Sequence, residues 1–350
     1  MDKNFSHGGQ VYDSDGRINF ELDFSANINP LGLPESVKRT LIENIGGLIH
    51  YPDPSASELK KALSKRYNVE ENKLVLLNGA AEFFYLYFNV TRPVRVLIPV
   101  PGFSEYEKAA SASGAQVQYF YLCEENNFEL DVDKLLNKIT AESFDCVIIG
   151  RPNNPTGNII SIDALKKISR KVNVVVDESF IDFLPIKSAR ELVNEKISVV
   201  QSLTKIFAIP GLRLGFAVVN DVLARRLNFS KDVWNVNFLA QKAGVAALDD
   251  KKYLNDTRAC LEVEKFYFAE RLRELPDLKV FDPTVNFILI KFSSKEIANS
   301  VIKKLRAEKI LVRSCGNFAG LDERFLRVAI RNRAENNLLV DNLKKILEVI

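Results

Sequence analysis

Short apolar runs alternate with helical segments between residues 73 and 219 of the chain. Seven of these runs are mostly apolar and do not alternate with polar residues, which is typical of strands covered on both faces. Helical segments lie between many of them, at 82–89, 105–113 and 162–170. The pattern predicts an α/β fold with a mostly parallel, doubly wound sheet, whose ligands gather at the carboxyl ends of the strands. The seven predicted strands are 74–77, 94–98, 117–122, 146–149, 172–176, 197–200 and 214–219.

The pattern changes on both sides of this region. The first 44 residues hold a polar arm, a segment rich in turn-forming residues and a predicted helix at 34–44, and a second helix, capped by Ser57, is expected to end at Tyr67. Beyond residue 233 a long helical region leads to short apolar runs and helices that predict an α+β domain. We therefore expect an N-terminal arm and segment that packs on the small domain (1–44), a large α/β domain (45–232) and a small C-terminal α+β domain (233–350). The elements predicted in the last part are strands 285–292, 310–313 and 325–330 and helices 295–308 and 334–349.

Composition narrows the class of protein. Hydrophobic residues make up 47% and charged residues 27% of the 350 positions, as in ordinary soluble globular proteins. The formal net charge of +3 comes without a basic block, so neither nucleic acid nor an anionic membrane surface is indicated as a partner. The four cysteines are far apart and only two histidines are present, so no metal site is expected. No secretory signal is visible and no apolar run approaches the roughly 20 residues of a membrane span, so we expect a cytoplasmic protein.

One lysine follows a predicted strand in a context that suggests chemistry. Lys205 ends the sequence Ser202-Leu203-Thr204-Lys205, and Arg213 follows eight positions later. A lone lysine after a strand is usually a solvated surface group. Two hydroxyls and an arginine nearby, however, are suited to holding a phosphate beside the amine. This combination suggests a Schiff base with pyridoxal phosphate, in which lysine is the covalent partner.

Two other strand ends fit the same cofactor. Gly79, Ala80 and Ala81 lead from a strand into a helix, where backbone amides bind phosphate well, although such a turn is more often only a turn. Phe103 follows the next strand and is suited to stacking on a heteroaromatic ring, with a place in the core as the alternative.

Polar side chains follow two further strands. Asn154, in a loop with two prolines and a glycine, is placed to donate a hydrogen bond to a phenolate-like oxygen, or else it only caps its own loop. Asp177 closes a buried strand, where a carboxylate needs a cation. A protonated pyridine nitrogen would be such a cation, and a structural salt bridge is the alternative. Together with Lys205 these groups supply every anchor that pyridoxal phosphate requires.

The order of these motifs resembles the fold-type-I pyridoxal phosphate enzymes, within the class that includes histidinol-phosphate aminotransferase. The resemblance covers essentially the whole chain and implies that fold and that cofactor. The motifs that carry it are Tyr51-Pro52-Asp53, Asn153-Asn154-Pro155-Thr156-Gly157, Asp177-Glu178, Ser202-Leu203-Thr204-Lys205 and Gly211-Leu212-Arg213-Leu214-Gly215.

The resemblance also implies a role for each motif. Lys205 would bind the cofactor covalently, Asp177 would pair with its ring nitrogen, and Asn154 would meet its ring hydroxyl. Phe103 would stack on the ring. Tyr51 would reach the cofactor phosphate of a neighbouring subunit, which implies a homodimer. The remaining phosphate contacts would come from Gly79, Ala80, Ala81, Ser202 and Arg213.

A closer resemblance is to the L-threonine-O-3-phosphate decarboxylase family of cobalamin biosynthesis, whose reaction releases CO2 to give (R)-1-amino-2-propanol phosphate. It rests on His7-Gly8-Gly9, residues 23–32, Asp177-Glu178-Ser179-Phe180, residues 313–322 and residues 327–331. Phe180 departs from the aminotransferase pattern, which usually has tyrosine there, and Ala80-Ala81 departs from the decarboxylase pattern, in which a hydroxyl is common. The residues implied to contact O-phosphothreonine are His7, Gly8, Asn27, Asn154, Arg313 and Arg327.

The cofactor motifs do not separate decarboxylation from transamination, since both reactions share every cofactor contact. The groups that bind substrate anions favour the decarboxylase, because Arg313, Arg327 and His7 offer positive charge for a phosphate and a carboxylate. Which arginine takes which anion stays open, and His7 belongs either to an arm that closes the site or to a frayed tail. The alternative is histidinol-phosphate aminotransferase or a related aminotransferase. A regulator without catalysis would need an appended DNA-binding module, for which no residues are left.

Overall fold

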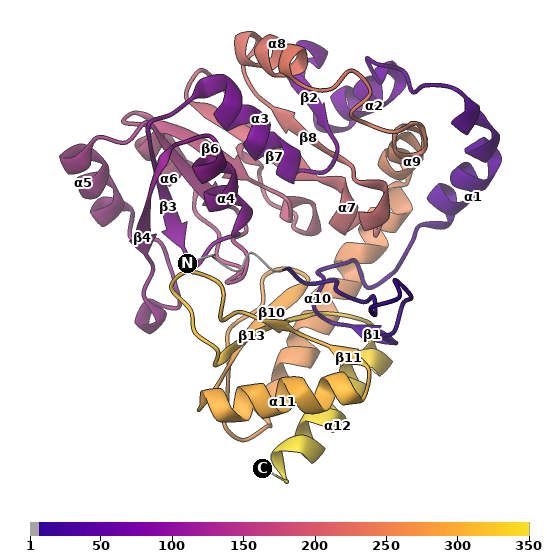
Figure 1. Cartoon of the computed structure of the whole chain (residues 1–350), viewed down its shortest axis with the longest axis vertical. Coiled ribbons are helices and arrows are strands. Elements are labelled where there is room, and N and C mark those ends of the chain that lie inside the picture. The colour runs from indigo at the N-terminus through magenta and orange to yellow at the C-terminus, as the bar shows by residue number, and fades with distance from the viewer. Residues whose placement is uncertain (1–6, 350) are drawn as a thin grey trace.

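The computed structural model describes residues 7–349. Seven strands form its largest sheet, in the order β2-β8-β7-β6-β5-β3-β4 (Figure 1). All neighbours in this sheet run parallel except β8, which is antiparallel to both β2 and β7. The predicted mostly parallel, seven-stranded α/β sheet is therefore confirmed. Its strands are β2 (Leu74–Leu77), β3 (Arg95–Val100), β4 (Gln116–Tyr121), β5 (Cys146–Gly150), β6 (Asn173–Asp177), β7 (Ile197–Ser202) and β8 (Gly215–Val218).

Helices cover both faces of this sheet, which explains why its strands are apolar without alternation. Adjacent residues of β3 show the two environments: Ile98 packs with side chains of α3 and α4, and Leu97 packs with those of α5 and α6. The edge strand β4 is only half-buried, because it has a single neighbour. The helices α5 and α8 were not predicted. The covering helices are α3 (Ala81–Thr91), α4 (Glu105–Ala112), α5 (Val132–Glu142), α6 (Ile162–Ser169) and α8 (Asp221–Ser230).

A smaller antiparallel sheet follows in the order β12-β13-β10-β9, and it lies below the large sheet in Figure 1. The strand predicted at 310–313 is divided in two. Its first half, β11 (Ile310–Leu311), pairs with β1 (Leu22–Asp23), and only its second half joins the smaller sheet. The strand β9 was not predicted. The elements are β9 (Leu278–Val280), β10 (Phe287–Phe292), β12 (Arg313–Ser314), β13 (Phe325–Ala329), α10 (Lys251–Arg273), α11 (Lys295–Ala307) and α12 (Arg333–Leu347).

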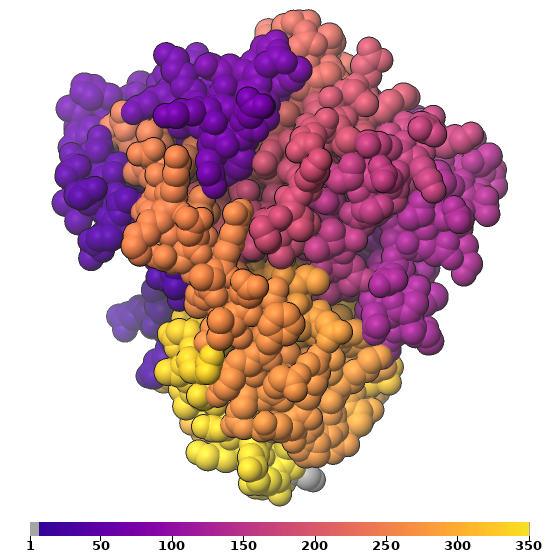
Figure 2. Space-filling model, turned by 180° about the vertical axis from the view of Figure 1, so that it is seen from behind, coloured from indigo at the N-terminus to yellow at the C-terminus, as the bar shows by residue number. Residues whose placement is uncertain are grey.

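N-terminal helices pack on a helix that lies some 200 residues later in the chain. Figure 2 shows the indigo segment of α1 (Glu35–Asn44) and α2 (Ser57–Tyr67) against the orange segment that contains α9 (Phe238–Asp249). The predicted cap of α2 was wrong: Ser57 is the first helical residue, and its backbone N–H donates to the Asp53 carboxylate at 2.7 Å.

The boundaries at 44/45 and 232/233 stay predictions. Across residues 7–349, no helix combines the length and the hydropathy needed to cross a bilayer. The loop at the carboxyl end of β5 reaches the smaller sheet, since the Asn154 side chain in this loop accepts a hydrogen bond from Arg327 of β13. This edge of the large sheet is therefore the place to look for a site.

Candidate active site

Lys205 lies in α7 (Leu203–Ile206), the short helix that begins directly after β7. Its Nζ lies 3.3 Å from Ser202 Oγ, and Ser202 Oγ lies 2.7 Å from Thr204 Oγ1. Burial lowers the pKa of Lys205 to about 8, against the opposing influence of the Asp177 charge. The neutral amine, which is the form that attacks a carbonyl, is therefore a minor but appreciable species near physiological pH, far more populated than for an ordinary lysine.

Asp177 is the last residue of β6, and its carboxylate is held by two donors. The Tyr106 hydroxyl donates to Oδ2 at 2.7 Å, and the backbone N–H of Ser179 donates to Oδ1 at 2.8 Å. Burial and the Asp177 charge raise the pKa of Tyr106 well above its usual value, so its hydroxyl stays a donor. No described Lys or Arg side chain forms an ion pair with Asp177. A buried carboxylate in this state is suited to a cationic ligand atom.

The predicted phosphate-binding residues meet where β2 and β7 end and β8 begins. Gly79 has a positive φ of 81°, and a Cβ at this position would lie 2.2 Å from a terminal nitrogen of Arg213. A Cβ on Gly215 would lie 2.7 Å from the backbone N of Ala80, so the turn before α3 packs tightly on β8. The amides near Ala80 and Ala81, the Ser202 hydroxyl and the Arg213 guanidinium are thereby grouped at one end of the site.

Two buried arginines face each other in the smaller sheet. Arg313 of β12 is directly opposite Arg327 of β13, and their relative exposures are 7% and 6%. Arg327 donates to the Asn154 Oδ1 and, at 2.7 Å, to the carbonyl oxygen of Ser25, while its Nε has no hydrogen-bond partner among the described residues. Arg313 donates to Asn317 Oδ1 at 2.7 Å.

The electrostatics of this pair favour an anion. Burial lowers the pKa of Arg327 to about 10, and the positive charge of Arg313 adds to the effect. Like charges directly opposite each other in a sheet repel. An anion bound between the two guanidinium groups would remove this repulsion.

Asn154 accepts from Arg327 through its oxygen, so its Nδ2 is left to donate, as predicted for the ring-hydroxyl contact.

The N-terminal arm lies over the site. His7 Nε2 lies 2.8 Å from Glu105 Oε1, and the His7 ring lies 5.6 Å from the Phe103 ring, centroid to centroid. A Cβ on Gly8 would lie 2.2 Å from the carbonyl oxygen of Ser25, so the arm touches the backbone there. His7, Gly8, Ser25 and Arg313 line one cavity of about 160 Å³. The described part of the arm is therefore docked beside Arg313.

Asn27 and Tyr51 differ in their placement. Asn27 is buried, its carbonyl oxygen accepts from Asn286 Nδ2 at 3.0 Å, and its Oδ1 has no partner within residues 7–349. Tyr51 is 76% exposed and stacks on Trp234 at 4.3 Å between ring centroids. The fold of one chain thus brings the other predicted residues together and leaves Tyr51 on the surface.

Sequence reasoning missed Glu105, Tyr106, Ser25 and Asn286 as contributors to the site. Glu105 and Tyr106 lie two and three positions after Phe103, so they could have been examined as part of the same segment. An acidic residue at the start of a helix, however, is expected simply from the helix dipole. Nothing in their sequence context indicates which side chain each would meet.

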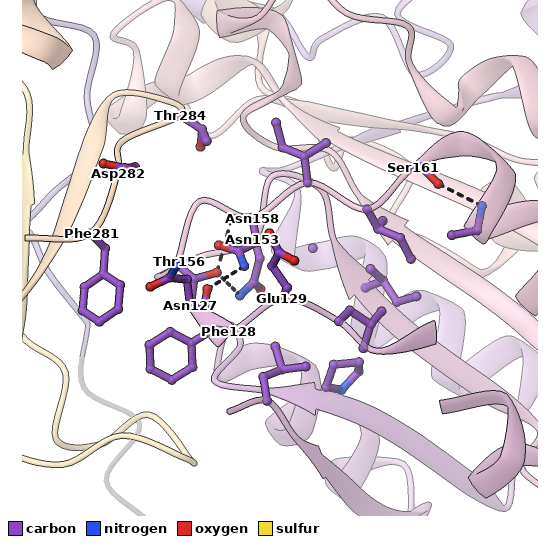
Figure 3. A pocket seen from close by; sticks show the side chains of 18 of the residues that line it. Asn127, Phe128, Glu129, Asn153, Thr156, Asn158, Ser161, Phe281, Asp282 and Thr284 are labelled. Carbon is purple, nitrogen blue, oxygen red and sulfur yellow. Dashed lines mark hydrogen bonds between the residues drawn. The ribbon is translucent and has the colours of Figure 1, made fainter. Parts of the chain in front are cut away.

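Two larger cavities flank this site. One, of about 710 Å³, is lined by Phe103, Ser104, Arg313 and Phe318, and so opens beside the arginine pair. The other, of about 560 Å³, lies behind the loop that carries Asn154 (Figure 3). There Asn153, Thr156 and Asn158 bond within the loop and to its neighbour Asn127, and Thr284 donates to the carbonyl oxygen of Gly157 at 2.6 Å. These bonds fix the loop that carries Asn154.

Comparison with known proteins agrees with this geometry. The family described as aminotransferase class I and II matches residues 21–343. The chain belongs to the class I and II aminotransferase family. Its members are fold-type-I enzymes, and pyridoxal 5'-phosphate, predicted above from the strand-end residues, is the cofactor of this family.

The residues present fit that cofactor. Asp177 is a buried carboxylate without an ion-pair partner among the described residues, and Lys205 is a half-buried residue whose amine charge interacts with that of Asp177. A phosphate-sized anion would find Gly79, which has no room for a side chain, next to the Arg213 guanidinium. The amine, the carboxylate and the phosphate cradle are the three anchors that the cofactor needs.

Relatives and solved structures include both activities considered above. The chain is 37% identical to a threonine-phosphate decarboxylase of Salmonella typhimurium, over 98% of this chain and 97% of the relative. The structure of a histidinol-phosphate aminotransferase from Clostridium acetobutylicum matches with a TM-score of 0.86 at 32% identity, over 94% of this chain and all of the other. The structure of L-threonine-O-3-phosphate decarboxylase from Porphyromonas gingivalis matches with a TM-score of 0.84 at 25% identity, over 93% of this chain and 99% of the other.

Proposed function

We propose that this member of the family is a pyridoxal phosphate-dependent lyase that decarboxylates L-threonine O-3-phosphate to (R)-1-amino-2-propanol phosphate in cobalamin biosynthesis. The observation that carries the proposal is the pair Arg313 and Arg327, which is buried and directly opposite across two strands. A substrate with a phosphate and a carboxylate close together supplies two anions for two guanidinium groups. The similarity to a threonine-phosphate decarboxylase supports the same substrate.

The residues around the cofactor have distinct roles in this reaction. When bound, the cofactor supplies an electron-accepting ring that stabilises the negative charge left on the α-carbon as CO2 departs. Asp177, held by Tyr106, is placed to keep a proton on the ring nitrogen. Lys205 would hold the cofactor through its amine and, with its pKa lowered to about 8, is suited to return a proton from Nζ to the α-carbon in place of CO2.

The other contacts follow the sequence-based assignment. Gly79, Ala80, Ala81, Ser202 and Arg213 hold the cofactor phosphate. Phe103 stacks on the ring, and Asn154 donates to the ring hydroxyl. The substrate is bound by His7, Gly8, Asn27, Asn154, Arg313 and Arg327.

The same proposal includes a cytoplasmic homodimer in which Tyr51 reaches the neighbouring active site. Apolar side chains next to Tyr51 support it, since Ile42, Ile45 and Ile49 are 67%, 62% and 83% exposed. Sedimentation velocity tests the dimer. Mixing Tyr51→Phe with Lys205→Ala tests the shared site, because a mixed dimer regains one site with both native residues. Cofactor affinity that is not regained in the mixture would contradict the Tyr51 assignment.

The deciding experiment is to incubate the holoenzyme with L-threonine O-3-phosphate without any 2-oxo acid, and to measure CO2 and aminopropanol phosphate. Both products are expected in equal amounts. Arg327→Gln should reduce kcat/KM roughly 100-fold or more, because removing one partner of a buried charge pair costs about 2–5 kcal/mol. The matched control is Arg225→Gln, which changes an exposed arginine of α8 and should leave kcat/KM unchanged.

The second candidate is histidinol-phosphate aminotransferase or a related aminotransferase. The structural similarity to such an enzyme from Clostridium acetobutylicum favours it, since both reactions use the same cofactor contacts. It predicts turnover that depends on 2-oxoglutarate and accumulation of the amine form of the cofactor. If only this transamination is observed, the decarboxylase proposal fails.

A further inference from the structure

The buried carboxylate of Glu105 connects the N-terminal arm to the body of the protein. Glu105 is the first residue of α4 and is 8% exposed. Its Oε1 lies 2.8 Å from His7 Nε2 and 3.4 Å from Lys108 Nζ, and its Oε2 accepts from the Tyr85 hydroxyl at 2.8 Å. His7 is 98 positions away in the sequence, so this contact is purely tertiary.

These contacts fix the protonation of the carboxylate. The hydrogen bond from His7, followed by those from Tyr85 and the charge of Lys108, holds the pKa of Glu105 at about 2 against the opposing effect of burial. An ionised carboxylate only accepts hydrogen bonds. The Nε2 of His7 must therefore carry the hydrogen that joins the two residues.

The second ring nitrogen of His7 is available for another partner. Within residues 7–349 no hydrogen bond reaches Nδ1, and the His7 side chain is 42% exposed. The ring lies beside Phe103 and lines the same small cavity as Arg313. One nitrogen thus faces the protein, while the other is free to meet a ligand that enters beside Arg313.

We propose that Glu105 is a positioning residue for the phosphate group of the substrate, acting through His7. The Glu105 carboxylate keeps the imidazole oriented through Nε2, so that Nδ1 is presented to the phosphate group of a ligand beside Arg313. The Tyr85 hydroxyl and the Lys108 amine keep the carboxylate in place. This inference rests on the proposed function, and it gives the site a means of preferring a phosphorylated amino acid to the unphosphorylated one.

The kinetic test uses Glu105→Gln in the full-length holoenzyme. Its KM for L-threonine O-3-phosphate should rise about 10-fold, as expected for the loss of one charge-assisted hydrogen bond, with a smaller change in kcat. The same substitution in a His7→Ala background should have no further effect on KM, because the two residues act as one unit. Asp163→Asn, which removes an exposed carboxylate from the first turn of α6, is the matched control. Equal KM increases in both backgrounds would overturn the inference.

A second test needs no turnover. The chain has only two histidines, so ¹⁵N-histidine labelling gives signals from His7 with His50 as an exposed internal reference. Inorganic phosphate should shift the His7 signals of the holoenzyme in a saturable way, and Glu105→Gln should weaken this response and alter the Nε2 signal, while His50 stays unchanged. If CO2 is released but the His7 signals do not shift with phosphate, the role of Glu105 is rejected and the decarboxylase proposal is retained. A response of His7 to phosphate without CO2 release would reject the decarboxylase alone.

Discussion

The Tyr106 hydroxyl donates a 2.7 Å hydrogen bond to the carboxylate of Asp177, and both side chains are buried. The two residues come from different elements, since Tyr106 lies in α4 and Asp177 ends β6. The bond fixes the orientation of the one carboxylate that faces the cofactor ring nitrogen in the proposed site. It also gives an oxygen of this buried carboxyl group the hydrogen-bond partner that burial requires.

Tyr106→Phe should therefore weaken cofactor binding, while the retained aromatic ring leaves no large cavity in the core. A hydrogen bond to a charged group contributes about 1.5–3 kcal/mol, and we expect the cofactor dissociation constant to rise about 10- to 100-fold. Titration of the apoenzyme with pyridoxal phosphate, followed by visible absorbance, measures this change. Tyr87→Phe removes another buried hydroxyl, which lies 4.0 Å from Cys146 Sγ, and should leave the dissociation constant unchanged. Equal effects of the two substitutions would argue against a specific role for Tyr106.

The buried amine of Lys205 predicts a pH dependence of stability. Burial lowers its pKa from 10.5 to about 8, so between these pH values the unfolded chain binds more protons than the folded apoenzyme. The free energy of unfolding should therefore rise with pH across this window, and the destabilising effect is complete below pH 8. Lys205→Met cannot titrate and should lack this rise. Urea unfolding of both apoenzymes from about pH 7 to 10.5 tests it, with the exposed Lys166→Met as control. Parallel pH profiles for the wild type and Lys205→Met would contradict the prediction.

Gly79→Ala should disturb the phosphate-binding end of the site. The new Cβ would lie 2.2 Å from an Arg213 nitrogen, and the positive φ of 81° adds backbone strain of about 1 kcal/mol. Arg213 must move, so the cofactor dissociation constant should rise roughly 10-fold or more. Gly211→Ala is a control in the turn next to Arg213, where a Cβ meets nothing within 4 Å. Retention of wild-type affinity by Gly79→Ala would show that Arg213 does not hold the phosphate.

A buried ion pair supports the same edge of the sheet. Arg151 and Glu178 lie 2.6 Å apart with almost no exposure, and Glu178 also accepts from the Ala189 N–H and Gln201 Nε2. Arg151→Met leaves this carboxylate buried without its cation and should lower the free energy of unfolding by about 3–5 kcal/mol. In contrast, Arg225→Met breaks the exposed pair with Asp221 and should cost less than about 1 kcal/mol. Urea unfolding at matched protein concentration distinguishes the two, and a small loss for Arg151→Met would mean that the pair contributes little.

Sequence patterns predicted the central sheet because a strand that is buried on both faces is apolar at nearly every position, and this pattern is visible within a few residues. Seven apolar runs without alternation became the seven strands, with shifts of one or two residues at their ends. The placement of Asp177 and Lys205 followed from this, since each directly ends or follows a strand. The strand β9 has only three residues, too few for a clear pattern, and was not predicted. The helices α5 and α8 were not predicted either, although Leu135 and Ile139 of α5 are buried at helical spacing.

Pairings between distant residues were decided by the tertiary structure. Nothing in the sequence says that Arg313 stands opposite Arg327, because that depends on the register of two strands separated by a loop. The division of 310–313 between two sheets depends on β1, which comes from the other end of the chain. Tyr106 with Asp177 and His7 with Glu105 are contacts of the same kind. The sequence alone determined which residues are buried and at which strand ends the chemistry lies, since hydrophobic periodicity is local. The tertiary structure alone decided which of these residues contact one another, since a hydrogen bond or a charge pair depends on distances that local periodicity does not encode.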